Sequence, residues 1–149
     1  MDVEYINLST EYERCKKNYG EFLNELVYRP LAFPFVMLAK KLRLTPNFVS
    51  IIAFIFTLLS GIFLALNHFQ IAASMFFLRH VFDNADGSLA RNLQQFSKIG
   101  ALFDAFCDGF GFLLAILGLM YGQYILTGNN LVFLWSFLMT LSLCVQVLT

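Results

Sequence analysis

The chain is 149 residues long, 58% hydrophobic and only 13% charged. A soluble domain usually carries about 25% charged residues, so this composition argues against an ordinary water-soluble protein. The 10 basic and 10 acidic side chains balance, and without a basic excess nothing in the composition indicates nucleic acid as a partner. The charges are unevenly spread, because seven of the ten basic residues precede residue 44 and no charged residue follows Asp108.

Four stretches are apolar and long enough to predict helices that cross a bilayer, which takes about 20 residues. They cover approximately residues 48–66, 71–91, 99–121 and 131–149. The links between them, 67–70, 92–98 and 122–130, are short, and the last contains the helix-breaking run Thr127-Gly128-Asn129-Asn130. Short links make successive helices antiparallel. The sequence therefore predicts an all-α integral membrane protein, an antiparallel bundle of about four transmembrane helices.

The distribution of Lys and Arg predicts how this bundle is oriented. Lys40, Lys41 and Arg43 precede the first stretch, and Arg91 and Lys98 flank the 92–98 link, whereas the other two links carry no basic residue. By the positive-inside rule, the N-terminus and the 92–98 link are expected to face the cytoplasm. Residues 1–30 hold six acidic and four basic side chains, so no cleavable signal peptide is expected there.

An amphipathic helix is expected just before the first stretch. Its apolar residues recur at helical spacing and are Leu31, Phe35, Leu38 and Leu42. Such a helix lies on the membrane surface with its cations near anionic lipid, or else it is simply a positive-inside anchor. Pro30 and Pro34 indicate that the helix begins or restarts near them. Residues 1–46 are thus expected to form a cytoplasmic and juxtamembrane segment, and residues 47–149 a transmembrane domain.

Four aspartates fall inside the predicted membrane helices, where each charge costs about 2.5–3.5 kcal/mol at mid-membrane. At 3.6 residues per turn, the polar residues of the second and third predicted helices each fall on one face of their helix. One face holds Asp83, Asp86, Gly87, Ala90 and Arg91, and the next helix holds Ser97, Gly100, Asp104 and Asp108 on one face. An alternative is that the carboxylates form buried ion pairs with Arg79, His80, Arg91 or Lys98, which is an expensive way to join helices.

Four carboxylates that face one another would bind protons or cations. Their hard oxygen atoms suit Mg²⁺, Ca²⁺ or Mn²⁺, and two such ions would roughly neutralise four carboxylates. A two-metal site indicates chemistry on a phosphate group. Gly87 and Ala90 leave room for a ligand on the same face, and Arg91 offers a fixed cation for phosphate.

These residues form a motif that resembles the signature of the CDP-alcohol phosphotransferase family, D-x2-D-G-x2-A-R-x8-G-x3-D-x3-D. Every fixed position is present between Asp83 and Asp108. The resemblance extends upstream to Tyr28-Arg29-Pro30-Leu31 and to Leu44-Thr45-Pro46-Asn47, which are similar to the family's surface helix and to the start of its first span. It implies an integral membrane enzyme, usually a homodimer and usually with six spans.

The resemblance also implies an activity and a role for each motif residue. Family members transfer a phosphoalcohol group, such as a phosphatidyl group, from a CDP-linked donor to the hydroxyl of an alcohol acceptor and release CMP. Asp83, Asp86 and Asp104 would bind two divalent ions, Mg²⁺ or Mn²⁺, and Asp108 would be the general base and in some members also touches a metal. The nucleotide or donor would contact Asn47, Ser50, Gly87, Ala90, Arg91 and Ser97. The acceptor alcohol is not determined by the motif.

Three other functions fit parts of the sequence. The carboxylates suit a cation-binding or cation-conducting membrane protein, although an arginine among them disfavours a cation path. A transferase acting on prenyl diphosphates also uses metal-bridged carboxylates, but on helices far apart in sequence. The uncharged end of the chain, with four predicted spans, suggests a truncated chain and hence an inactive fragment or an interaction module. Its Gly118-Leu-Met-Tyr-Gly122 sequence would pack helices within the chain or in a dimer.

Overall fold

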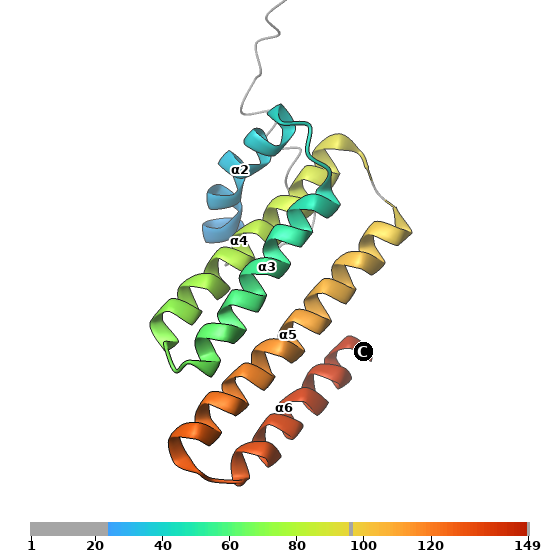
Figure 1. The fold of residues 1–149 in the computed structure, drawn as a ribbon. Helices are drawn as coiled ribbons and strands as arrows, with labels where there is room; N and C mark the ends of the chain where they lie inside the picture. Colours follow the sequence, from blue (N-terminus) through green and yellow to red (C-terminus); the bar gives the residue numbers. More distant parts are fainter. Residues whose placement is uncertain (1–23, 96, 149) are drawn as a thin grey trace, which may run out of the picture. The chain divides into compact units, whose positions relative to one another are not determined.

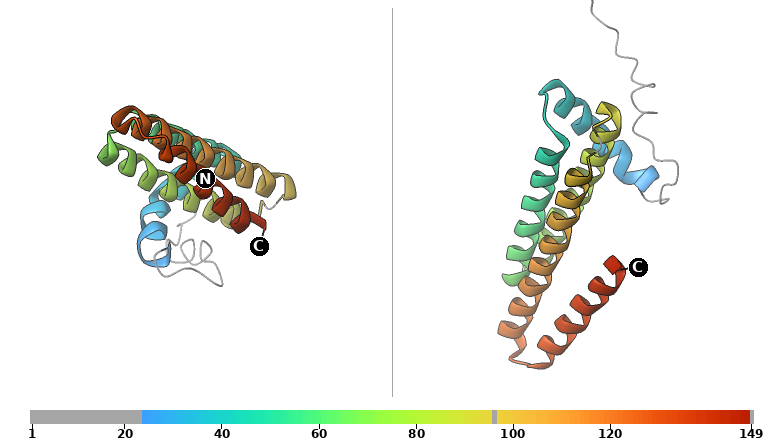
Figure 2. Two further views of the ribbon diagram at one scale, coloured as in Figure 1. Left: turned by 90° about the horizontal axis from the view of Figure 1, so that it is seen from below. Right: turned by 90° about the vertical axis from the view of Figure 1, so that its right-hand side faces the viewer.

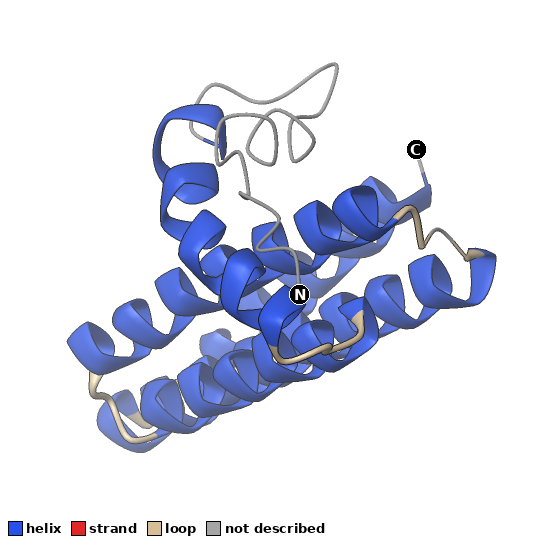
Figure 3. Cartoon of the chain, turned by 90° about the horizontal axis from the view of Figure 1, so that it is seen from above, coloured by secondary structure: helices blue, strands red, loops and turns tan. Residues whose placement is uncertain are grey.

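The described part of the chain is helical throughout, apart from short links, and contains no strand (Figure 3). We describe a computed structural model that covers residues 24–95 and 97–148. A π-helical turn, η1 (Asn24–Tyr28), precedes α2 (Arg29–Lys41), α3 (Pro46–Ala65), α4 (Phe69–Leu93), α5 (Lys98–Thr127) and α6 (Leu131–Leu148) (Figure 1). The predicted all-α class is confirmed. The expectation of a polar, signal-free N-terminus falls mainly on residues 1–23, which lie outside the described residues.

Each of the four apolar stretches corresponds to one helix, but the third helix is longer than predicted. We expected it to end near Tyr121 and residues 122–130 to form a link, whereas α5 continues to Thr127. The expected start of the link was wrong, because residues 122–127 continue the helix up to the predicted breaker run. A Cβ atom on Gly122 would lie 2.4 Å from the carbonyl oxygen of Leu64, so this glycine permits close packing. The helix ends at Gly128, whose φ of 62° is left-handed.

Three helices end on a residue other than glycine in the left-handed conformation. These residues are Arg43 (φ 55°), Asn67 (φ 61°) and Gln94 (φ 54°). After α3, the amide of Asn67 donates to the carbonyl of Leu64 at 3.0 Å, and the amide of His68 donates to the carbonyl of Phe63 at 2.8 Å. This pair of bonds is a Schellman motif, which satisfies carbonyls at the helix end. The same two bonds follow α2 and α4, so the links reverse the chain within a few residues.

Two of the described helices, α3 and α5, are long and apolar enough to cross a membrane. Helix α4 has 25 residues, but it carries four charged side chains, Arg79, Asp83, Asp86 and Arg91. In α6 the described apolar stretch, Leu131–Ser142, is shorter than a full span. The structure therefore supports two candidate spans, and the count of four transmembrane helices stays a prediction.

The described residues form two compact units, and the first consists of residues 24–53 and 80–104. Its core joins α2, the first turns of α3 and the second half of α4, and contains Ala32, Val36, Ala39, Val49, Val81, Ala85 and Leu89. The residues expected to form the apolar face of the surface helix, Leu31, Phe35, Leu38 and Leu42, are exposed. Helix α2 thus has a second apolar face that packs inward, and it runs unbroken through Pro34.

The second unit, residues 54–79 and 105–148, is held together by small residues at a helix–helix contact. Gly111, Ala115, Gly118 and Gly122 of α5 lie against the C-terminal half of α3. Contacts advance in the same direction along both helices, from Thr57 with Gly111 to Leu64 with Gly122. These parts of α3 and α5 are therefore parallel neighbours. In the same unit, α6 turns back from α5 through the three-residue link 128–130 (Figure 2).

Gly118 makes the tightest of these contacts and is the best test of them. A Cβ atom there would lie 2.1 Å from the backbone carbonyl oxygen of Gly61, and backbone cannot move aside cheaply. We expect Gly118→Ala to destabilise the purified protein by about 1–3 kcal/mol, as overpacking does in other cores. Thermal unfolding in detergent measures this effect. Gly109→Ala is the matched control, because a Cβ atom on Gly109 meets nothing within 4 Å; equal melting temperatures for the two variants would contradict the prediction.

Candidate functional site

A cavity of about 440 Å³ lies within the first unit, between the start of α3, the end of α4 and the start of α5. Eight of the ten residues that the sequence suggested for a site line it. They are Asn47, Ser50, Asp86, Gly87, Ala90, Arg91, Ser97 and Asp104. The cavity therefore brings together residues up to 57 positions apart in the chain, including two carboxylates and one guanidinium.

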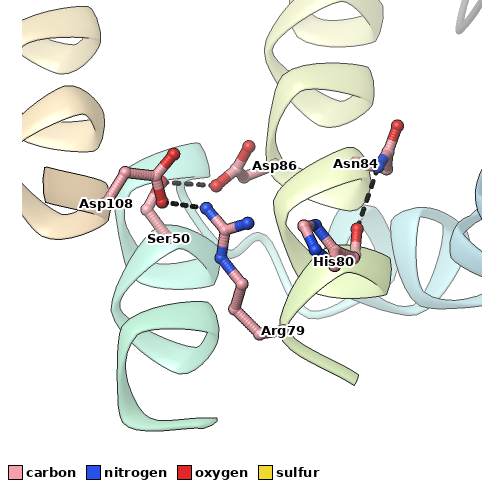
Figure 4. A network of polar contacts seen from close by, with 6 residues as sticks. All are labelled: Ser50, Arg79, His80, Asn84, Asp86 and Asp108. Atoms are coloured by element: carbon pink, nitrogen blue, oxygen red, sulfur yellow. Dashed lines mark hydrogen bonds and ion pairs between the residues drawn. The ribbon is translucent and has the colours of Figure 1, made fainter. Parts of the chain in front are cut away.

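Asp86 is the most buried of the four motif aspartates, with 5% of its surface exposed. Burying a carboxylate is costly unless it is hydrogen-bonded. The hydroxyl of Ser50 on α3 donates to Oδ2 of Asp86 at 2.6 Å, and both side chains are shown in Figure 4. A hydroxyl-to-carboxyl hydrogen bond this short belongs to the strong class of hydrogen bonds. Asp86 is thereby held at the wall of the cavity.

Asp83 and Asp104 come from different helices and lie close together. Oxygen atoms of the two carboxylates are within 4.8 Å of each other, and both side chains are half-buried. Two carboxylates at this separation repel unless a cation or a proton lies between them. Their oxygen atoms are hard ligands of the kind that Mg²⁺ and Mn²⁺ prefer. The residues present in the first unit therefore fit a divalent cation.

Arg91 and Gly87 shape the cavity one helical turn apart on α4. The Nη2 atom of Arg91 donates to the hydroxyl of Ser88 at 3.0 Å, which fixes the guanidinium near Gly87. A Cβ atom on Gly87 would lie 3.5 Å from Nη1 of Arg91, an ordinary van der Waals distance. No contact in the described chain therefore demands glycine at position 87. Its missing side chain instead leaves the cavity open beside a fixed cation.

Ser97 has a structural role that its position in the motif did not predict. Its hydroxyl accepts a hydrogen bond from the amide of Gly100 at 2.9 Å, which caps the N-terminus of α5. A Cβ atom on Gly100 would lie 2.9 Å from this hydroxyl and 3.2 Å from Oδ1 of Asn47. Glycine at position 100 thus leaves room both for the Ser97 cap and for the side chain of Asn47 on α3. We expected Ser97 and Asn47 to contact a donor, and the cavity wall still contains both.

Asp108 lies in the second unit, where it forms an ion pair with Arg79 (Figure 4). Arg79 is 3% exposed, and its guanidinium lies over the ring of Phe112 at 4.8 Å. The sequence argument gave little weight to ion pairing of the aspartates with basic residues. Asp108 nevertheless forms such a pair, because Arg79, four residues before the motif, is buried and needs a carboxylate partner. The guanidinium fixes the orientation of the Asp108 side chain.

Five further residues line the cavity wall, and one of them, Gly100, is a fixed position of the motif; the other four were not identified as site residues from the sequence. These four are Thr45, Pro46, Gln95 and Ala101. Gln95 follows the left-handed residue that ends α4, and its amide donates to the carbonyl of Ala90 at 3.0 Å. Gln95 reaches the cavity because of the conformation of the link between α4 and α5, and the spacing of residues in the sequence does not predict that conformation. The residues around Pro46 carried a signal, since the resemblance already included the Thr45-Pro46-Asn47 run.

Comparison with known proteins agrees with this site. A family model described as CDP-alcohol phosphatidyltransferase matches residues 43–149. An uncharacterized protein of Aquifex aeolicus (strain VF5) is 31% identical over 117 residues, which are 77% of this chain and 58% of that protein. The chain thus spans little more than half the length of this relative. Because the family model covers well over half of the chain and includes every motif residue from Asp83 to Asp108, the chain belongs to the CDP-alcohol phosphatidyltransferase family.

Proposed function

We propose that this protein transfers a phosphoalcohol group, such as phosphatidyl, from a CDP-linked donor to an alcohol acceptor in phospholipid synthesis. The family consists of transferases of this kind. The observation that carries the proposal is the cavity of the first unit, where Asp86 and Asp104 lie with Arg91 beside an open glycine position. Carboxylates that bind cations and an arginine that binds phosphate are together suited to a pyrophosphate ligand.

Asp83, Asp86 and Asp104 are the proposed ligands of two divalent ions, Mg²⁺ or Mn²⁺. The oxygen donors of Asp83 and Asp104 within 4.8 Å of each other support this assignment, as does the buried carboxylate of Asp86. When bound, such ions neutralise the charge of a pyrophosphate. Arg91 would hold a phosphate oxygen, and Asn47, Gly87, Ala90 and Ser97 would contact the nucleotide from the cavity wall.

Asp108 is the proposed general base, on the strength of its place in the motif. Its carboxylate would accept the proton of the acceptor hydroxyl while the hydroxyl oxygen bonds to the donor phosphorus. The bond from this phosphorus to the CMP oxygen breaks, and CMP leaves. The ion pair with Arg79 supports the role, because a fixed orientation favours proton transfer from a positioned hydroxyl.

We further propose a multi-pass membrane protein whose transmembrane domain begins near residue 47. In this arrangement α4 and α6 cross the bilayer together with the candidate spans α3 and α5 as an antiparallel bundle, and α2 lies at the surface with its exposed apolar face in lipid. The basic residues near both ends of the 92–98 link support an active site that faces the cytoplasm. A homodimer is the expected assembly, as the family resemblance implies.

A cation-binding protein without transferase activity is the alternative. It would use the same carboxylates, but Arg91 lines the cavity with them and would repel a permeating cation. Cation flux in reconstituted vesicles that contain no CDP-linked substrate would favour this alternative. An inactive fragment would release no CMP from any donor and acceptor combination.

Removal of divalent metal is the first test of the proposed activity. The purified protein, supplied with a CDP-linked lipid donor and an alcohol acceptor, should release CMP only with Mg²⁺ or Mn²⁺. Treatment with EDTA should abolish CMP release, and added Mn²⁺ should restore it, because without a cation the carboxylates repel the pyrophosphate. CMP release measured by chromatography checks this outcome. Undiminished release in excess EDTA would exclude the proposed metal site.

Asp108→Asn separates the base from the metal ligands. Asparagine has the same shape and can still accept a hydrogen bond from Arg79, so the fold should be kept. We expect CMP release to fall by about 100-fold or more, the usual contribution of a general base, while Mn²⁺ still binds. Asp86→Asn is the contrasting variant, in which Mn²⁺ binding should weaken as well. Full activity of Asp108→Asn would disprove the base role.

Gly87→Ala tests whether the open position beside Arg91 serves the donor. The added methyl group would make only ordinary contacts within the protein, so thermal stability should match that of the wild type. The methyl group would fill space at the cavity wall and displace the donor, and we expect kcat/KM to fall by about 100-fold. Gly109→Ala is again the control and should stay active. The prediction fails if Gly87→Ala turns over at the wild-type rate.

A further inference from the structure

Ser50 lies beside a carboxylate in the interior of the first unit. Ser50 and Asp86 are each 5% exposed, and they come from α3 and α4, 36 residues apart in the chain. The serine hydroxyl donates to Oδ2 of Asp86 at 2.6 Å (Figure 4). The sequence motif suggested instead that Ser50 contacts the donor. Its observed partner indicates a different role.

The single proton of the Ser50 hydroxyl has two acceptors within reach. The carbonyl oxygen of Pro46, one turn back on the same helix, is 3.4 Å away, whereas Oδ2 of Asp86 is 2.6 Å away. Serines in helices commonly donate to the carbonyl four residues back, as Ser74 does to Gln70 at 2.9 Å. For Ser50 the much shorter distance to Oδ2 shows that the hydroxyl donates mainly to the Asp86 carboxyl group and not to Pro46.

We propose that Ser50 is a positioning residue that orients Asp86 for metal binding, an inference that rests on the metal site of the proposed function. With Oδ2 held by the hydroxyl, Asp86 presents its other oxygen, Oδ1, to the cation. Carboxylates that bind metals are usually held in this way by hydrogen-bonding partners. Loss of such a partner typically weakens metal affinity or activity by about 10- to 100-fold.

The test is Mn²⁺ binding to the purified full chain in detergent, with unbound Mn²⁺ measured by electron paramagnetic resonance. Ser50→Ala should raise the dissociation constant for Mn²⁺ by about tenfold or more. Ser60→Ala is the matched control. Ser60 lies on the same helix and is 1% exposed, and its hydroxyl donates to the backbone carbonyl of Ala72 at 3.0 Å. It should bind Mn²⁺ as the wild type does.

A second pair of variants separates the hydroxyl from the packing of the side chain. Ser50→Thr and Ser50→Val have nearly the same shape, and only threonine keeps the hydroxyl. We expect Ser50→Thr to bind Mn²⁺ nearly as the wild type does and Ser50→Val to share the loss of Ser50→Ala. Equal affinities of the threonine and valine variants would overturn the proposal, as would an equal loss of affinity in Ser60→Ala or a wild-type protein that binds no Mn²⁺.

Measurement of CMP release in parallel distinguishes this inference from the proposed transferase activity. Weaker Mn²⁺ binding in Ser50→Ala supports the positioning role even if the wild type releases no CMP. The absence of CMP release would contradict only the transferase proposal. Conversely, unchanged Mn²⁺ affinity in Ser50→Ala overturns the positioning role, even if the wild type releases CMP at a high, metal-dependent rate.

Discussion

The first unit depends on the burial of the Asp86 carboxylate among helices that are otherwise largely apolar. A carboxylate with 5% exposure is costly to bury unless a hydrogen-bond donor lies beside it. Ser50 is that donor, and its position requires the start of α3 to lie against the second half of α4. The core residues Ala32 and Val36 of α2 pack in one cluster with Ala85 and Leu89 of the same part of α4. The cavity is the space that this arrangement leaves open.

Close helix packing is the corresponding requirement in the second unit. Helices that lack a polar interface gain stability from van der Waals contact, which increases as the backbones approach. Gly118 and Gly122 allow the backbone of α5 to lie directly against the carbonyl groups of α3. The GxxxG sequence is therefore used inside the chain. Arg79 is accommodated in the same unit by two favourable contacts, the carboxylate of Asp108 and the ring of Phe112.

Several residues of the family motif serve the fold and the cavity at once. Ser97 caps α5 and lines the cavity, and Gly100 makes space for that cap and for Asn47. Gly87 is different, because no contact of the described chain requires a glycine there. This contrast separates glycines that the helix packing needs from a glycine that the described packing does not require. The proposed binding of a phosphate donor between helices would use both kinds.

The sequence by itself determined the helical class, the approximate position of each helix and the motif that identifies the family. These features follow from local rules, since apolar runs, helix breakers and the 3.6-residue period depend on near neighbours in the chain. The partners of the polar groups were decided only by the tertiary structure. Ser50 meets Asp86 across 36 residues, and Arg79 meets Asp108 across 29. The GxxxG sequence indicated that Gly122 packs against a helix, and only the tertiary structure showed that this helix is α3 of the same chain. In each case the outcome depends on which helix faces meet. Helical spacing shows which residues share one face of a helix, but it does not show which other helix packs against that face.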